Sequence, residues 1–167
     1  MHRKAELVQA RLRELGATGE VREMPASTRT SAEAATVVGT TVDQIAKSIV
    51  LMAGQASSGE PSPVLVIASG ANRVDLDKVA AVVGEPVTSV DAKTVKRVTG
   101  FAAGGVPPVA HLTPPRVLVD RDLLAHPVVW AAAGTPNALF PTTAEELLRI
   151  TGGEVADVRV ENAVEPV

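Results

Sequence analysis

The sequence contains no cysteine and very few aromatic residues, and both absences narrow what the protein can be. Without cysteine there is no disulfide framework, no thiolate metal site and no cysteine nucleophile. Aromatic residues make up 2% of the chain, so its 46% hydrophobic content must build a core mainly from Ala, Val, Leu and Ile. The same scarcity leaves at most one side chain on which a nucleic-acid base could stack.

Long apolar runs and cofactor-binding motifs are also missing. No stretch approaches the ~20 residues needed to span a bilayer, and the N-terminus predicts an amphipathic helix, not an apolar signal segment. We therefore expect a soluble cytoplasmic protein with no membrane partner. The glycine fingerprints of dinucleotide and P-loop sites are absent. Three scattered histidines, His2, His111 and His126, lack the paired spacing of metal ligands, so we expect neither a metal nor another cofactor.

The net charge of −3 argues against binding along a nucleic-acid duplex, because that affinity comes from many phosphate contacts. We therefore expect no DNA partner, although contact with one end of an RNA is compatible with this charge. The densest basic group is Lys93, Lys96 and Arg97. A solvated helix face is the favoured interpretation of this group over an RNA contact.

The length of 167 residues fits one domain with one core, predicted over residues 1–160, followed by a polar tail over 161–167. Apolar spacing and capping residues predict helices at 3–15, 30–38, 75–83, 91–98 and 143–150. Strands are predicted at 20–24, 47–53, 63–68, 87–90, 116–120, 128–133, 137–140 and 155–160, with an exposed loop at 54–62. Because the helices are short and several strands look hairpin-linked, the fold class is α+β. We expect a mixed, mostly antiparallel sheet that closes into a partly open barrel with peripheral helices.

Two features suggest a small ligand pocket. Lys47 is predicted to stand at the head of an apolar strand, where its ammonium loses water and needs an anionic or carbonyl partner. The segment from Thr99 to His111, here called the glycine loop, contains Gly104 and Gly105 followed by two prolines. A Gly-Gly step lets the backbone approach a ligand and offers N–H groups to an oxygen. The residues themselves leave simpler interpretations open, namely a lysine that reaches solvent and an ordinary turn.

Four segments, in this order and spacing, resemble the aminoacyl-tRNA editing family that contains YbaK and the prolyl-tRNA synthetase-associated (ProX, or INS-type) domains. They are residues 28–35 (TRTSAEAA), residues 45–50 (IAKSIV), residues 99–108 (TGFAAGGVPP), and Ala133-Gly134 followed by Leu139 and the helix 143–150. The resemblance covers roughly residues 3–158. It implies a freestanding deacylase that acts in trans on a mischarged tRNA, because no synthetase catalytic domain fits in this length. It also implies a synthetase as a second candidate partner beside the tRNA acceptor end.

The resemblance assigns roles to particular residues. Lys47 corresponds to the central site residue, which holds the terminal adenosine or the ester end of the substrate. Gly104 and Gly105 line the pocket through their backbone, and the strand end Ala132, Ala133 and Gly134 lines the amino-acid side. In the family the ribose hydroxyl of the substrate is thought to help activate the attacking water, which fits a chain with no Ser-His-Asp set. Cysteine-specific members have Ser where Pro107 stands and a Ser near Ala132, so this chain departs from a cysteine specificity.

Other residues are weaker candidates. Thr28 and Arg29 could close the pocket, although a polar loop before a helix is the commoner explanation. His111 follows the glycine loop and is a modest candidate for lining the pocket. Phe101, Phe140 and Trp130 are predicted core residues. A non-catalytic module that binds a tRNA end or a small molecule, and a hydrolase of other activated esters, are the competing functions. The sequence does not identify the amino acid.

Overall fold

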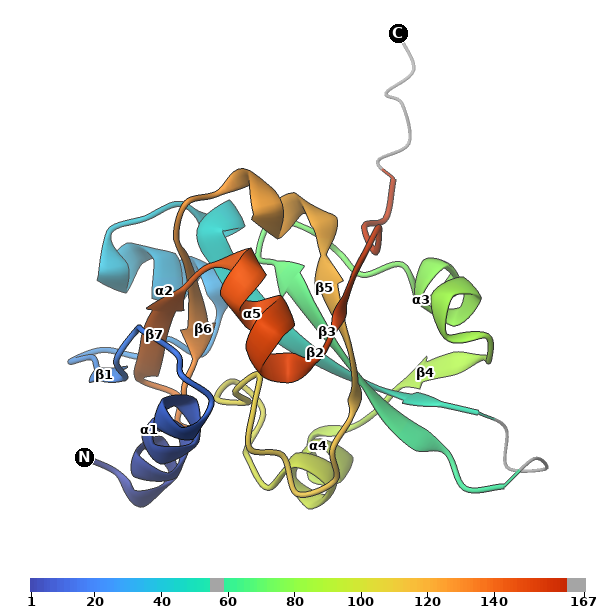
Figure 1. Ribbon diagram of the computed structural model, residues 1–167, viewed down its shortest axis with the longest axis horizontal. Helices are drawn as coiled ribbons and strands as arrows, with labels where there is room; N and C mark the ends of the chain where they lie inside the picture. The colour runs from blue at the N-terminus through green and yellow to red at the C-terminus, as the bar shows by residue number, and fades with distance from the viewer. Residues whose placement is uncertain (55–58, 162–167) are drawn as a thin grey trace, which may run out of the picture.

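The computed structural model describes residues 1–54 and 59–161 (Figure 1). Its helices are α1 (Arg3–Glu14), α2 (Ser31–Val38), α3 (Leu76–Val83), α4 (Ala92–Thr99) and α5 (Ala144–Thr151), with short 3₁₀ helices η1 (Val42–Gln44) and η3 (Arg121–Ala125). Its strands are β1 (Arg22–Glu23), β2 (Ile45–Ala53), β3 (Ser62–Ser69), β4 (Val87–Ser89), β5 (Arg116–Asp120), β6 (Val129–Ala132), β7 (Ala138–Thr142) and β8 (Glu154–Ala156). No helix in these two described ranges is long and apolar enough to cross a membrane.

The strands form one mixed sheet in the order β1-β7-β6-β2-β3-β5-β8. The remaining strand, β4, pairs with the last three residues of β2, whereas β6 pairs with the first two. Four of the pairings are antiparallel and three are parallel. The predicted α+β class and mixed sheet are therefore confirmed. The predicted closure into a partly open barrel is not, because the strand order runs from β1 to β8 without a pairing between these two ends in the described part of the chain.

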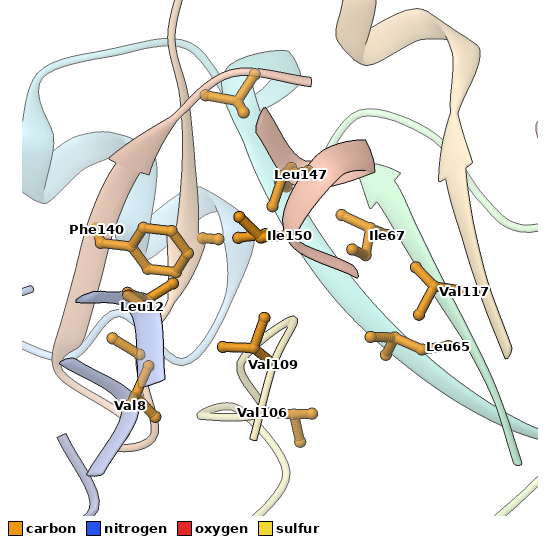
Figure 2. Close-up of a cluster of buried hydrophobic side chains, with 14 of the residues drawn as sticks. Val8, Leu12, Leu65, Ile67, Val106, Val109, Val117, Phe140, Leu147 and Ile150 are labelled. Atoms are coloured by element: carbon orange, nitrogen blue, oxygen red, sulfur yellow. The ribbon is translucent and has the colours of Figure 1, made fainter. Parts of the chain in front are cut away.

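Alternating side chains of the central strands feed different clusters on the two faces of the sheet. Leu65 and Ile67 of β3 join the main cluster with α1, α5, the glycine loop and strands β5 to β7, as Figure 2 shows. Val64 and Val66 point to the opposite face, where they pack in a cluster with residues of α3 and β4. A third cluster forms where α2 packs on Ile45, Leu139 and Trp130. Phe101 and Phe140 are core residues as predicted. Trp130 is only partly buried, and the Arg22 guanidinium carbon lies over its ring, 5.1 Å from the ring centroid.

Local capping explains most helix boundaries. Thr30 accepts a hydrogen bond from the Glu33 N–H at 3.1 Å, and the Glu33 side chain returns to the Thr30 N–H, which completes the predicted capping box of α2. Gly39 ends this helix in the left-handed conformation, with φ +74°. The helix and its N-cap therefore follow directly after the polar loop 26–29. The position of α2 thus fixes the end of that loop.

The last strand is shorter than predicted, and the structure gives the reason. β8 ends at Ala156, and the chain then turns toward the segment that follows β3. The Asp75 N–H donates to the Val158 carbonyl at 2.7 Å, and the Val160 N–H donates to the Arg73 carbonyl at 2.8 Å. The predicted tail lies outside the described residues except for Glu161.

Candidate active site

The candidate site lies where β2 changes its neighbour in the sheet. β2 pairs with the parallel strand β6 only at Ile45 and Ala46, and it pairs with β4 from Leu51 onward. Residues 47–50 have no strand partner on this edge within the described ranges. A cavity of about 290 Å³ opens beside them, and four segments line it: residues 28–31 with Ala34, residues 45–49 of β2, Gly104 with Val106, and Ala132 with Leu139.

Lys47 lies third in β2, not at its head as predicted, because the pairing with β6 extends the strand back to Ile45. Its ammonium donates a hydrogen bond to the Asn72 carbonyl. Burial lowers the pKa of Lys47 below the usual lysine value, and the Asp120 carboxylate opposes this shift. Since an ammonium has three N–H donors, two have no acceptor among the described residues and are available to a ligand.

Thr28 and Arg29 bring the polar loop against the glycine loop. Thr28 is buried, and both its N–H and its hydroxyl donate to the Pro136 carbonyl, at 2.7 and 3.1 Å. Arg29 is exposed, and its side-chain stem covers Gly104 so closely that a Cβ on this glycine would lie 2.5 Å from Arg29 Cγ. The two loops therefore meet at the cavity, and Thr28 and Arg29 both belong to its lining.

Gly104 and Gly105 have different surroundings. Gly104 lines the cavity with φ +89°, and its N–H has no acceptor among the described residues. The Gly105 N–H donates to the Ala102 carbonyl at 3.0 Å, and its carbonyl accepts from the Gly134 N–H at 2.9 Å. Gly105 thus ties the glycine loop to the β6–β7 turn and is not itself part of the lining. Buried Val106 and Val109 anchor the same loop in the core (Figure 2).

The structure brings together Thr28, Arg29, Lys47, Gly104 and Ala132 of the predicted site. Ala133 is buried behind the cavity, and its N–H donates to the Ala138 carbonyl at 2.9 Å. Gly134 packs on α1, where an added Cβ would lie 2.9 Å from the Lys4 carbonyl oxygen. Neither residue is part of the lining, because β6 ends at Ala132 and the chain turns away toward β7.

A comparison with known families decides the relationship of this chain. The family model of the aminoacyl-tRNA editing domain matches residues 25–150, which include every segment that lines the cavity. The chain belongs to the aminoacyl-tRNA editing domain family.

Solved structures and a curated relative agree with this assignment. A protein described as a candidate trans-editing enzyme for prolyl tRNA synthetase shares 46% identity with this chain, covers 96% of it and 99% of itself, and superimposes with a TM-score of 0.87. The hypothetical protein APE2540 shares 32% identity over 92% of this chain and 99% of its own, with a TM-score of 0.84. The uncharacterized protein YwhH of Bacillus subtilis (strain 168) is 28% identical over 81% of this chain and 83% of its own length.

His111 of this editing domain faces a second cavity of about 190 Å³, between the glycine loop, α1 and α5. Its Nε2 lies 2.6 Å from the Pro107 carbonyl oxygen. Because a carbonyl only accepts, Nε2 carries the proton in this contact. His111 therefore holds the proline end of the glycine loop from behind, whereas the sequence suggested that it lines the pocket itself.

His111 also predicts a pH-dependent stability. Burial lowers the pKa of its imidazole below the usual 6.5, although the hydrogen bond to Pro107 opposes the shift. The unfolded chain then binds a proton near pH 6.5 that the folded chain does not yet bind. Stability is therefore full above pH 6.5 and falls as the pH drops toward the folded pKa, by at most about 1.4 kcal/mol per pH unit. Urea unfolding at several pH values checks this, with His111→Gln, which removes the titrating imidazole, expected to flatten the profile. A His111→Gln profile as steep as the parent's would contradict it.

The other two histidines have local roles. His2 caps α1, because its Nδ1 accepts from the Lys4 N–H at 3.0 Å. His126 Nε2 lies 3.5 Å from a carboxylate oxygen of Asp43. Across residues 1–54 and 59–161, no group of three His, Asp or Glu side chains could hold a metal ion.

Three residues near Lys47 were missed by the sequence analysis. Asn72, on the turn after β3, accepts from the Lys47 ammonium through its carbonyl, and Asp120, at the end of β5, accepts from the Asn72 side chain and attracts the ammonium from beyond ion-pair distance. Ser48 lines the cavity, and its hydroxyl oxygen is buried without a hydrogen-bond partner in the described residues. A carboxylate directly after the apolar run of residues 117–119 is the one sequence signal that could have drawn attention to Asp120.

Proposed function

We propose that this protein is a freestanding trans-editing deacylase that hydrolyses the ester between a small amino acid and a mischarged tRNA, with tRNA(Pro) or a related tRNA as the carrier. The observation that carries the proposal is the cavity beside residues 47–50, which is lined both by Lys47 and by Gly104, a glycine whose N–H has no acceptor among the described residues. The family assignment and the 46% identical neighbour support the tRNA as substrate and the synthetase as a further partner.

The residues of the cavity suit ester hydrolysis without a protein nucleophile. Among residues 1–54 and 59–161, the lining includes hydroxyls of Thr28, Thr30, Ser31 and Ser48, but no His, Asp or Glu that could act as their base. An activated ester requires less assistance than an amide, so a positioned water and stabilisation of the developing oxyanion suffice. The ribose hydroxyl next to the ester is then the group that helps to activate this water.

Lys47 and Gly104 contact different parts of the substrate. The Lys47 ammonium keeps one N–H on Asn72 and turns the others to the tRNA end, where it anchors the ester-bearing ribose. The Gly104 N–H donates to the carbonyl oxygen as water adds to the carbonyl carbon and negative charge develops there. Collapse of the tetrahedral intermediate breaks the bond to the ribose oxygen, which takes up a proton. Gly105 contributes by fixing the position of Gly104.

The cavity wall sets the size of the amino acid. Ala132 and Leu139 stand opposite β2 and leave about 290 Å³, near the lower end of the usual range for ligand pockets. A small amino acid with part of the terminal ribose fits this space better than a large side chain. The net charge of −3 is compatible with contact limited to the acceptor end. We place the reaction in the cytoplasm, together with the aminoacylated tRNAs.

Deacylation of a panel of mischarged tRNAs tests the proposal. The panel begins with alanyl-, cysteinyl- and seryl-tRNA(Pro), each with the parent protein and with Lys47→Ala. Release of one amino acid by the parent that is lost in the variant supports the deacylase and identifies the substrate. Binding of uncharged tRNA without turnover of any charged tRNA would instead support a non-catalytic binding module. Faster turnover of a simple amino-acid ester than of any tRNA would support a small-ester hydrolase.

A further inference from the structure

We propose that Asn72 and Asp120 are positioning residues for Lys47, which hold its ammonium at the cavity and keep it charged. This inference rests on the proposed function, because it assigns to these residues a role in the same site. It concerns residues outside the cavity lining, on the turn after β3 and at the end of β5.

The turn that carries the Asn72 carbonyl is fixed from several sides. The Asn72 N–H donates to the Ser69 carbonyl at 2.9 Å, and the Gly70 N–H donates to the Ile45 carbonyl at 2.7 Å. Gly70 also has no room for a side chain, since a Cβ would lie 2.5 Å from the Val42 carbonyl oxygen. The Asn72 carbonyl is therefore presented to the Lys47 ammonium by a rigid segment and is not a chance surface contact.

The side chain of Asn72 fastens this turn to two carboxylates. Its amide nitrogen donates to Asp120 Oδ2 and to Asp122 Oδ2, each at 2.8 Å. Asp120 is only 1% exposed and also accepts from the Ser69 N–H at 3.0 Å and the Asp122 N–H at 2.9 Å. These three donors hold the buried carboxylate of Asp120 in one orientation. Asn72 thus joins the buried negative charge to the backbone oxygen that contacts Lys47.

Among the charged groups near Lys47, Asp120 is the counter-charge of its ammonium. Asp122 is partly exposed and has a partner in Arg159, 3.4 Å away. Asp43, on η1, lies 3.5 Å from His126. Arg29 shares the cavity with Lys47 and adds positive charge there. Asp120 has no cation within ion-pair distance in the described residues, and its attraction for Lys47 is the interaction that opposes the cost of burying the ammonium.

A charge-only substitution of Asp120 therefore changes the titration of Lys47. Burial lowers the pKa of Lys47 and Asp120 opposes this, so Asp120→Asn is expected to lower the pKa of Lys47 further. Because Lys47 acts as a cation, the alkaline limit of deacylation should move to lower pH by the same amount. Asn72→Ala keeps the backbone carbonyl but loses the link to Asp120, and it should raise KM more than it lowers kcat.

Titration of the lysine side chains by NMR is the test that does not depend on activity. The chain has five lysines, Lys4, Lys47, Lys78, Lys93 and Lys96, and the loss of one signal in Lys47→Ala assigns the resonance. The parent, Asp120→Asn and Asn72→Ala are titrated side by side. Asp157→Asn is the matched control, because it removes a carboxylate that pairs with Lys78 and Arg121 and does not contact Asn72. If Asp120→Asn fails to fold, Asn72→Ala tests the same link.

The outcomes separate this inference from the proposed function. A lower Lys47 titration midpoint in Asp120→Asn, with an unchanged one in Asp157→Asn, supports the positioning role. If no mischarged tRNA is deacylated but this midpoint moves, the proposed function fails while the coupling of the three residues stands. If the parent is active and neither the midpoint nor the alkaline limit moves in Asp120→Asn or Asn72→Ala, the inference is overturned.

Discussion

Replacement of Lys47 by alanine is expected to slow deacylation of the cognate mischarged tRNA by about 100-fold or more, with little change in stability. The side chain lines the cavity, and its ammonium has two N–H donors that no residue of the described chain uses. Under the proposed function, the substitution removes the cation that anchors the ester end, whereas the hydrophobic clusters on both sides of the sheet keep all their members. Single-turnover deacylation, together with urea unfolding of both proteins, measures the two effects.

Two further variants make this result specific. Lys47→Met retains much of the side-chain volume without the charge, so it should be as slow as Lys47→Ala. Lys93→Ala removes an exposed lysine of α4 and should deacylate like the parent. Activity of Lys47→Met close to that of the parent would show that volume, and not charge, is what the site requires, and the assigned role of Lys47 would then be wrong.

Gly105→Ala is expected to destabilise the protein by about 1–3 kcal/mol and to reduce deacylation sharply. A Cβ at this position would lie 2.8–3.0 Å from backbone atoms of Thr135, which cannot move without shifting the β6–β7 turn. The displaced loop would carry the Gly104 N–H away from the ester carbonyl. Denaturant unfolding and deacylation kinetics, measured on the same preparation, test both parts of this prediction.

Gly39→Ala provides the matched control for Gly105→Ala. Gly39 has φ +74° and open space around its Cβ position, so the substitution adds backbone strain without a collision. Gly39→Ala should lower the free energy of unfolding by about 1 kcal/mol and leave the deacylation rate unchanged. Equal stability losses in the two variants, with full activity in both, would mean that the contact between Gly105 and Thr135 does not hold the loop at the site.

Elements with local signals were predictable from the sequence. The capping box Thr30-Glu33 and Gly39 fix both ends of α2, and the apolar run before Asp120 matches β5 residue for residue. The elements that differed depend on partners distant in the chain. β2 begins two residues early because Ile45 and Ala46 pair with β6, and β8 ends early because residues 157–160 turn toward residues 73–75. Neither pairing can be recognised from the residues of β2 or β8 alone.

The residues of the candidate site also fall into those with a local sequence signal and those that depend on distant partners. Lys47 and Gly104 stand out locally, as a lysine in an apolar strand and a glycine in a proline-rich loop, and both line the cavity. Asn72 has no signal of its own, since its role depends on the turn that brings its carbonyl to Lys47. His111 was misplaced for a related reason. Gly104 and Val106 of the same loop line the candidate-site cavity, but residues 108–111 line the second cavity instead.

The departure of β2 from β6 after Ala46 has an evolutionary consequence. Under the proposed function, the residues that would bind the tRNA end lie on β2 and the glycine loop, whereas Ala132 and Leu139, which would limit the size of the amino acid, lie on β6 and β7. A substitution at Ala132 alters the space for the amino acid without touching the pairing of β2 with β3. If the proposed function holds, related chains can therefore diverge in the amino acid they remove while they keep the same residues for binding the tRNA end.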